Sequence, residues 1–144
     1  MLNTRSPMTA MLGLVAALAM PAPTAHADTP LALKLTDTGQ RDYYCTATFK
    51  LDAPEGVAFQ DVNGFFYVFV GDEQVGRSKG ASFRFDDGQR TASATFETPN
   101  APCGEVDGYV FVVGACMQEG SFIDRNECAA GIRADGPVTE VRAR

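Results

Sequence analysis

Residues 65–70 read Phe-Phe-Tyr-Val-Phe-Val, and the next three residues are Gly71, Asp72 and Glu73. Aromatic and β-branched residues favour strands, and an apolar run that ends at glycine and acidic residues is typical of a strand entering a hairpin. A second run, Tyr-Val-Phe-Val-Val, occupies residues 109–113. Both runs predict strands that are apolar on their two faces.

Shorter stretches bounded by turn residues predict the remaining strands. About seven short strands, with turn signals at intervals of about 8 to 12 residues, predict an all-β antiparallel sandwich, and a closed barrel is the alternative. The expected strands are residues 31–35, 43–50, 65–70, 74–79, 81–86, 90–97 and 106–116. In residues 43–50, one face of the strand is expected to carry Tyr43, Cys45, Ala47 and Phe49. In residues 90–97, the residues expected to face inward are Ala92, Ala94 and Phe96.

The stretch over residues 75–85 needs an interruption. An unbroken strand would turn Arg77 and Lys79 toward the core, so we expect a break near Gly80. The dipeptide Asp87-Gly88 then predicts a hairpin between the strands on either side of it. Farther along, Asp124 and Glu127 have the spacing of a capping box and Gly131 suits a helix end, which predicts one short helix.

Residues 1–27 have the order of a secretory signal. One cation, Arg5, precedes a 13-residue apolar run and the motif Ala-His-Ala. The run is shorter than the roughly 20 residues that cross a bilayer, so we expect cleavage after residue 27 and no membrane insertion afterwards. The protein would be periplasmic or secreted. We expect a sandwich domain over residues 28–131 and a charged end over residues 132–144 that frays or forms an edge strand.

Composition excludes several kinds of chemistry. The one histidine, His26, lies in the expected signal. A mature chain without histidine has no imidazole base, no Ser-His or Cys-His pair, and no zinc or copper site built on imidazole. After cleavage, 11 Lys and Arg remain against 18 Asp and Glu, a net charge of −7 that argues against nucleic acid and anionic membranes. We therefore expect no catalytic residue, no metal and no cofactor, and predict that the chain is not an enzyme.

The four cysteines all follow the expected signal. An even count in an oxidising compartment predicts two disulfides. We favour Cys45 with Cys103 and Cys116 with Cys128, of which the second pins the tail to the last long strand. If a break at Gly80 reverses the chain direction, Cys45 with Cys116 becomes the better pairing.

The two apolar runs have more hydrophobic surface than one core uses. An antiparallel sandwich covers only one face of each sheet. If the two runs share a sheet, with residues 90–97 between them, its outer face carries an apolar patch, and such patches mark interaction surfaces. Alternatively, the segment from Cys116 to Cys128 folds over this face with Phe122 and Ile123. The candidate binding residues are Phe65, Tyr67, Phe69, Val110 and Val112.

Four cations fall within fourteen residues, at Arg77, Lys79, Arg84 and Arg90. Alternating charges of this kind protect edge strands from aggregation, which we favour over a role in holding an acidic ligand.

The spacing of hydrophobic residues and cysteines over most of residues 43–128 resembles a known family. The matching features are Tyr-Cys-Thr-Ala-Thr-Phe at residues 44–49, the run at 65–70, Val75-Gly76, Phe96-Glu97, Cys103 with Val106-Asp107, and Cys116 with Cys128. They resemble small secreted bacterial fibronectin type III-like proteins of the interleukin receptor mimic (IrmA) kind. The resemblance implies an immunoglobulin-like sandwich without enzymatic activity that binds a protein ligand and forms a strand-exchanged dimer.

Two functions follow from these features. The first is an exported protein-binding module whose apolar sheet face binds a protein or forms a homodimer. The second is an acidic inhibitor or sequestering protein for a basic enzyme of the lysozyme type, acting through its negative charge and a disulfide-pinned loop at residues 98–104.

Overall fold

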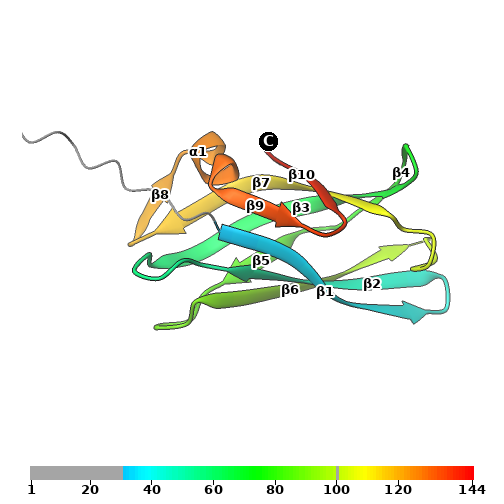
Figure 1. The fold of residues 1–144 in the computed structure, drawn as a ribbon, viewed down its shortest axis with the longest axis horizontal. Coiled ribbons are helices and arrows are strands. Elements are labelled where there is room, and N and C mark those ends of the chain that lie inside the picture. Colours follow the sequence, from blue (N-terminus) through cyan, green and yellow to red (C-terminus); the bar gives the residue numbers. More distant parts are fainter. Residues whose placement is uncertain (1–30, 100) are drawn as a thin grey trace, which may run out of the picture.

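The computed structural model describes residues 31–99 and 101–144, so the expected signal segment lies outside the described residues. The described chain forms ten strands and one six-residue helix (Figure 1). The elements are β1 (Leu31–Arg41), β2 (Tyr44–Asp52), β3 (Phe59–Val70), β4 (Glu73–Arg77), β5 (Ala81–Arg84), β6 (Thr91–Pro99), β7 (Gly108–Gln118), β8 (Ser121–Ile123), α1 (Arg125–Ala130), β9 (Ile132–Asp135) and β10 (Val138–Ala143).

The strands pack as two sheets, which confirms the all-β sandwich. One sheet has the order β6-β2-β1-β9, and the other has the order β10-β7-β3-β4, with β5 also paired to β3 and β8 to β7. Pairing is antiparallel except that β9 runs parallel to β1 and β10 runs parallel to β7. Residues 132–143 therefore form edge strands in both sheets, which is the edge-strand alternative predicted for the charged C-terminal end.

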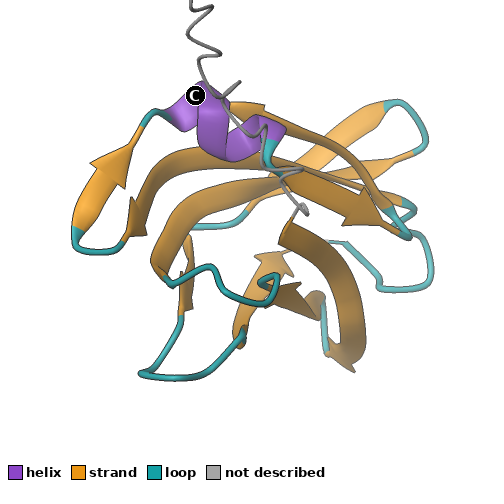
Figure 2. Cartoon of the chain, turned by 60° about the vertical axis from the view of Figure 1, so that its left-hand side comes forward, coloured by secondary structure: helices purple, strands orange, loops and turns teal. Residues whose placement is uncertain are grey.

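Figure 2 shows the two layers of strands. Buried aromatic rings form the core between them. Phe66 of β3 lies at the centre, with its ring centroid 4.3 Å from Phe49, 4.9 Å from Phe96 and 4.7 Å from Phe111. Phe49 and Phe96 come from the four-stranded sheet, so the ring stack joins the two sheets. The alternation expected for β6 is confirmed, because Ala92, Ala94 and Phe96 are buried and the residues between them are exposed.

The predicted break near Gly80 is present, since β4 ends at Arg77 and β5 begins at Ala81. Both strands pair antiparallel with β3, so the chain keeps its direction across the break. Arg77 and Lys79 are exposed as a result. Because the chain does not reverse, the two disulfides are those favoured from the sequence, Cys45 with Cys103 and Cys116 with Cys128.

Three expectations were wrong in detail. The Asp87-Gly88 turn is not a hairpin, because β5 pairs with β3 in one sheet and β6 pairs with β2 in the other. For the same reason, β6 does not lie between β3 and β7, which pair directly. Tyr43 is 80% exposed and lies in the β1–β2 turn, where Asp42 has a φ of 46°, so the strand begins one residue later than expected.

Helix α1 begins and ends as its sequence predicts. The Asp124 carboxylate accepts hydrogen bonds from the backbone N–H groups of Asn126 and Glu127, and Gly131 is the C-terminal cap. The Glu127 and Asn126 amides lower the pKa of Asp124. Cys128 is buried and bonded to Cys116, so the disulfide attaches the helix to β7. Figures 1 and 2 both place the helix next to the C-terminus.

Candidate protein-binding face

The five candidate residues lie together on the outer face of the six-stranded sheet. Alternate residues of β3 point in opposite directions, so Phe66 and Val68 enter the core while Phe65, Tyr67 and Phe69 face outward and are partly buried. On β7, Val112 pairs with Phe65 and Val110 pairs with Tyr67. We call this surface the outer aromatic face, and it consists of Phe65, Tyr67, Phe69, Val110 and Val112.

The two valines and the three aromatic residues have different accessibility. Val110 and Val112 are 6% and 3% exposed, because neighbouring side chains cover them. The aromatic side chains keep part of their surface in solvent. A partner on this face would therefore contact mainly Phe65, Tyr67 and Phe69.

Arginines from both edge strands lie over the aromatic rings. The Arg77 guanidinium of β4 is 3.9 Å from the Phe65 ring centroid, and the Arg142 guanidinium of β10 is 5.9 Å from the Tyr67 centroid. The Phe65 and Tyr67 rings meet edge to face, with centroids 5.2 Å apart. These side chains surround a depression of about 350 Å³, which we call the arginine hollow. It is lined by Phe65, Tyr67, Arg77, Val112, Arg142, Ala143 and Arg144.

A second depression lies farther along the same face, toward the β3–β4 turn. It measures about 360 Å³ and carries three carboxylates, so we call it the acidic hollow. The Gly71 N–H, in a residue with φ of 57°, donates to both Asp107 carboxylate oxygens at 3.1 and 3.0 Å. This bond connects the turn to the loop before β7. The lining residues are Phe69, Gly71, Asp72, Asp107, Gly108, Val110, Thr139 and Glu140.

The segment from Cys116 to Cys128 contributes no residue to either hollow. Phe122 of β8 is 73% exposed, and β8 extends the sheet by pairing with β7. Helix α1 contacts β7, β9 and β10. The residues that partly cover the outer aromatic face come instead from β4 and β10, above all Arg77 and Arg142.

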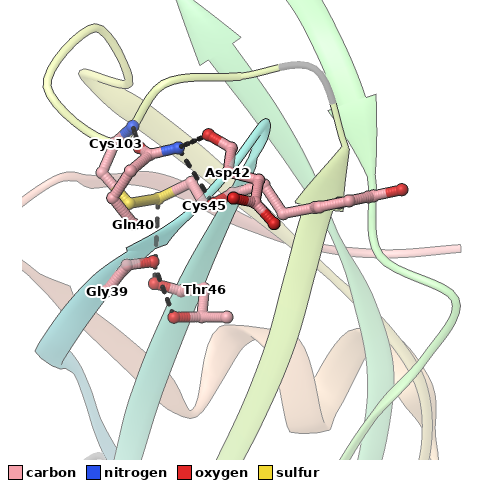
Figure 3. The surroundings of a disulfide bond; sticks show 7 residues. Gly39, Gln40, Asp42, Cys45, Thr46 and Cys103 are labelled. Atoms are coloured by element: carbon pink, nitrogen blue, oxygen red, sulfur yellow. Dashed lines mark hydrogen bonds between the residues drawn. A yellow bond between two sulfur atoms is a disulfide. The ribbon is translucent and has the colours of Figure 1, made fainter.

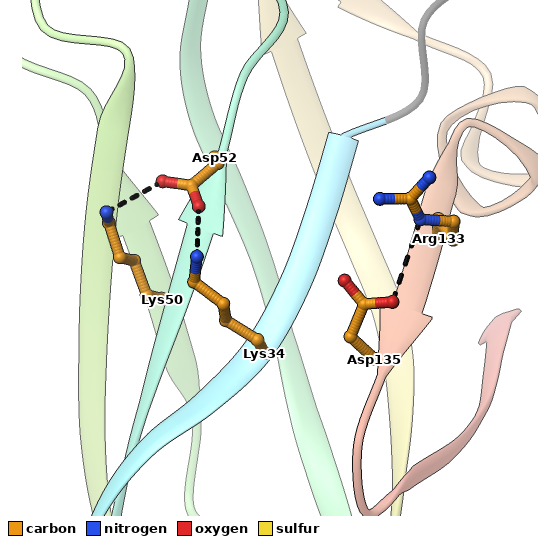
Figure 4. Close-up of polar contacts among 5 residues, drawn as sticks. All are labelled: Lys34, Lys50, Asp52, Arg133 and Asp135. Atoms are coloured by element: carbon orange, nitrogen blue, oxygen red, sulfur yellow. Dashed lines mark ion pairs between the residues drawn. The ribbon is translucent and has the colours of Figure 1, made fainter.

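The outer face of the four-stranded sheet is polar by comparison. Thr48 and Thr95 share a hydrogen bond of 2.9 Å between their hydroxyl groups. Asp52 forms ion pairs with Lys34 at 2.9 Å and with Lys50 at 3.0 Å (Figure 4). Burial raises the pKa of Asp52, but the two lysine ammonium groups together lower it by more, so the net shift of the pKa is downward. The polar groups of this face are thus largely paired with one another.

The four cations grouped in the sequence do not form one site. Arg84 lies opposite Asp61 on the neighbouring strand, and Arg90 is 3.7 Å from Glu55. Only Arg77 reaches the outer aromatic face. The arginines missed by the sequence are Arg142 and Arg144, because their place beside β3 and β7 depends on the parallel pairing of β10.

A rigid tip at one end of the sandwich is a second accessible surface. The β1–β2 turn, the β3–β4 turn and the loop before β7 gather at the right-hand end of Figure 1. The Gln40 side chain donates to the carbonyls of Asp42 and Tyr44 and accepts from the N–H of Cys103 (Figure 3). The Cys45–Cys103 disulfide fixes the loop to β2. A hollow of about 490 Å³ lies here, lined by Gln40, Asp42, Tyr43 and Pro102.

Ser78 and Lys79, neighbours in the sequence, have different surroundings. The Ser78 hydroxyl, 1% exposed, accepts a hydrogen bond from the N–H of Phe66, whereas Lys79 is exposed. Over residues 31–99 and 101–144, no cluster of His, Cys, Asp and Glu is arranged to hold a metal ion. No helix in this same part of the chain is long and apolar enough to cross a membrane.

The architecture is similar to a solved structure. The fold resembles that of IrmA from Escherichia coli. The two chains share 14% sequence identity with a TM-score of 0.57, over 74% of this chain and 91% of IrmA. At this identity the similarity shows the fold alone. No protein-family model matches the sequence, and no curated protein matches it.

Proposed function

We propose that the chain is an exported, non-enzymatic protein-binding module whose binding surface is the outer aromatic face. The observation that supports this is the accessible stripe of Phe65, Tyr67 and Phe69 between charged rims on the two edge strands. Protein interfaces commonly combine a central aromatic cluster with a polar rim, and aromatic residues and arginine are frequent hot spots. The fold shared with IrmA and the two disulfides are compatible with an exported protein.

Side-chain substitutions on two surfaces test this proposal. The oxidised protein, immobilised through an N-terminal tag, is exposed to the extracellular and periplasmic proteins of its own cells, and bound proteins are quantified by mass spectrometry. Tyr67→Asp places a charge in the centre of the outer aromatic face, and Tyr43→Asp is the matched control at the tip. We expect partners that are lost with Tyr67→Asp and retained with Tyr43→Asp. Partners that survive Tyr67→Asp would place binding on another surface.

A second candidate function is the inhibition or sequestration of a basic enzyme of the lysozyme type through the tip. The observation that favours it is the exposure of Tyr43 and Tyr44, 80% and 46%, on a turn held by the Cys45–Cys103 disulfide and Gln40. Tyrosines on a rigid support supply large contact areas at low entropic cost. Because the negative charge of the chain would drive this binding, binding to lysozyme should weaken steeply between low and physiological salt and should be weakened by Asp42→Asn at the tip. Salt-independent binding, or none, would exclude this function.

A further inference from the structure

Two hollows of nearly equal size and opposite charge lie on the outer aromatic face. The arginine hollow, about 350 Å³, lies at the Phe65 end of the aromatic stripe, and the acidic hollow, about 360 Å³, lies at the Phe69 end. Three arginines line the first and three acidic residues line the second. Tyr67, with Val110 beside it, lies between the charged groups. The face therefore carries positive charge at one end, negative charge at the other and apolar groups in the middle.

The side chains of Arg77 and Arg142 are available to a partner. A guanidinium stacked on an aromatic ring is attracted through its flat face, and its N–H groups point outward from its edge, where they can donate to carboxylates. Among the described residues Arg77 has no acidic group within 4.0 Å. Arg142 is 3.9 Å from Glu140, with both side chains about half exposed, and such surface pairs contribute little. The contact with the Phe65 ring thus positions Arg77 without using its hydrogen-bonding capacity, and Arg142 lies farther from its ring, 5.9 Å from the Tyr67 centroid.

We propose that the partner of this face is a second copy of the chain, bound face to face. The two-fold axis lies in the interface, crosses the strands and passes between Tyr67 and Phe69. This inference rests on the proposed function of the same surface. A rotation of 180° about that axis exchanges the two ends of the face. Each arginine hollow then lies opposite the acidic hollow of the other copy, and the aromatic stripes meet in the middle. A two-fold interface requires a surface that is complementary to itself. The outer aromatic face meets this requirement because its two ends carry opposite charge.

The size of the face sets the expected affinity. Four strands about 4.8 Å apart, and about eight residues at about 3.3 Å each, cover on the order of 500 Å² per copy. The total of about 1,000 Å² is near the lower limit for a specific interface, so we expect a dissociation constant on the order of micromolar. Because ion pairs at the rim are screened by salt, the dimer should weaken as the ionic strength rises.

Charge reversal tests the two-fold arrangement. The dissociation constant is measured by sedimentation velocity on the oxidised protein over a concentration series up to about 0.5 mM, a range chosen for micromolar dimers. Arg77→Glu reverses a charge in the arginine hollow and Asp72→Arg reverses one in the acidic hollow. Arg133→Glu, on the edge of the other sheet, is the control. Thermal unfolding of each variant checks that it is folded.

We expect the wild type and Arg133→Glu to dimerise, and each of the other two variants alone to dimerise at least about tenfold more weakly, because like charges then face one another. An equimolar mixture of Arg77→Glu and Asp72→Arg should recover dimers, because the two altered positions face each other in the heterodimer. A wild type that stays monomeric over the whole range overturns this inference. The proposed function is tested separately by the capture experiment, and it fails if the captured partners still bind the Tyr67→Asp variant. A dimer that both reversals leave intact uses another surface and also overturns the inference.

Discussion

Two adjacent phenylalanines of β3 are predicted to have very different effects on stability. Phe66 is fully buried and packs its ring against Phe49, Phe96 and Phe111. A buried Phe→Ala substitution costs about 3–5 kcal/mol, and lost aromatic pairs place Phe66→Ala in the upper half of that range. Phe65, on the outer face, loses one cation–π contact of about 0.5–1 kcal/mol and one aromatic pair of about 0.5–1.5 kcal/mol when replaced by alanine. Phe65→Ala should therefore cost about 1–2.5 kcal/mol.

Urea unfolding of the oxidised protein, followed by circular dichroism, measures this difference. With a slope of about 1.5 kcal/mol per M, the midpoint should fall by about 2.7–3.3 M for Phe66→Ala and by about 0.7–1.7 M for Phe65→Ala. The wild type and Phe65→Ala should have the same slope. Equal midpoints for the two variants, or a larger loss for Phe65→Ala, would mean that the two faces of β3 are wrongly assigned. The reasoning about the outer aromatic face would then be refuted.

Two further predictions concern the disulfides and Asp52. Replacing Cys45 and Cys103 by serine opens a loop with a sequence separation of 58 and should lower the free energy of unfolding by about 4 kcal/mol in the chain-entropy model. Replacing Cys116 and Cys128 opens a loop with a separation of 12 and should lower it by about 3 kcal/mol. Denaturant titrations that reverse this order would contradict the prediction. The lowered pKa of Asp52 stabilises the fold at pH values above its unfolded pKa of about 3.9, and this stabilisation disappears as the pH falls through the folded pKa. Asp52→Asn should therefore be less stable than the wild type at pH 7, and the difference should shrink as the pH falls below about 3.9. A difference that does not change with pH would show that the ion pairs are not the cause.

The sequence predicts much of the fold because side-chain alternation in a strand depends only on local pattern. The inward residues of β6 and the outward arginine of β4 follow from that pattern. The partner of a strand depends on distant residues, and this explains the wrong hairpin at Asp87-Gly88. A turn dipeptide fixes the local bend, but it does not determine which sheet the next strand joins.

The candidate site was predicted in part for the same reason. Phe65, Tyr67 and Phe69 share a face by their spacing in one strand, and the expectation that β7 joins the same sheet holds. The charged rims were not predictable in this way. Arg142 and Glu140 reach this face because β10 pairs in parallel with β7, more than twenty residues earlier in the chain, and a charged C-terminal stretch gives no local sign of such pairing.

Crosslinking from a single residue in living cells tests the central claim most directly. A photoreactive phenylalanine analogue replaces Tyr67 on the outer aromatic face or, in a matched variant, Thr48 on the polar face of the other sheet. After irradiation, mass spectrometry identifies the adducts, which separates a second copy from a different protein. We expect protein adducts from position 67 and none from position 48. Adducts from position 48 with none from position 67 would contradict the assignment of the binding surface.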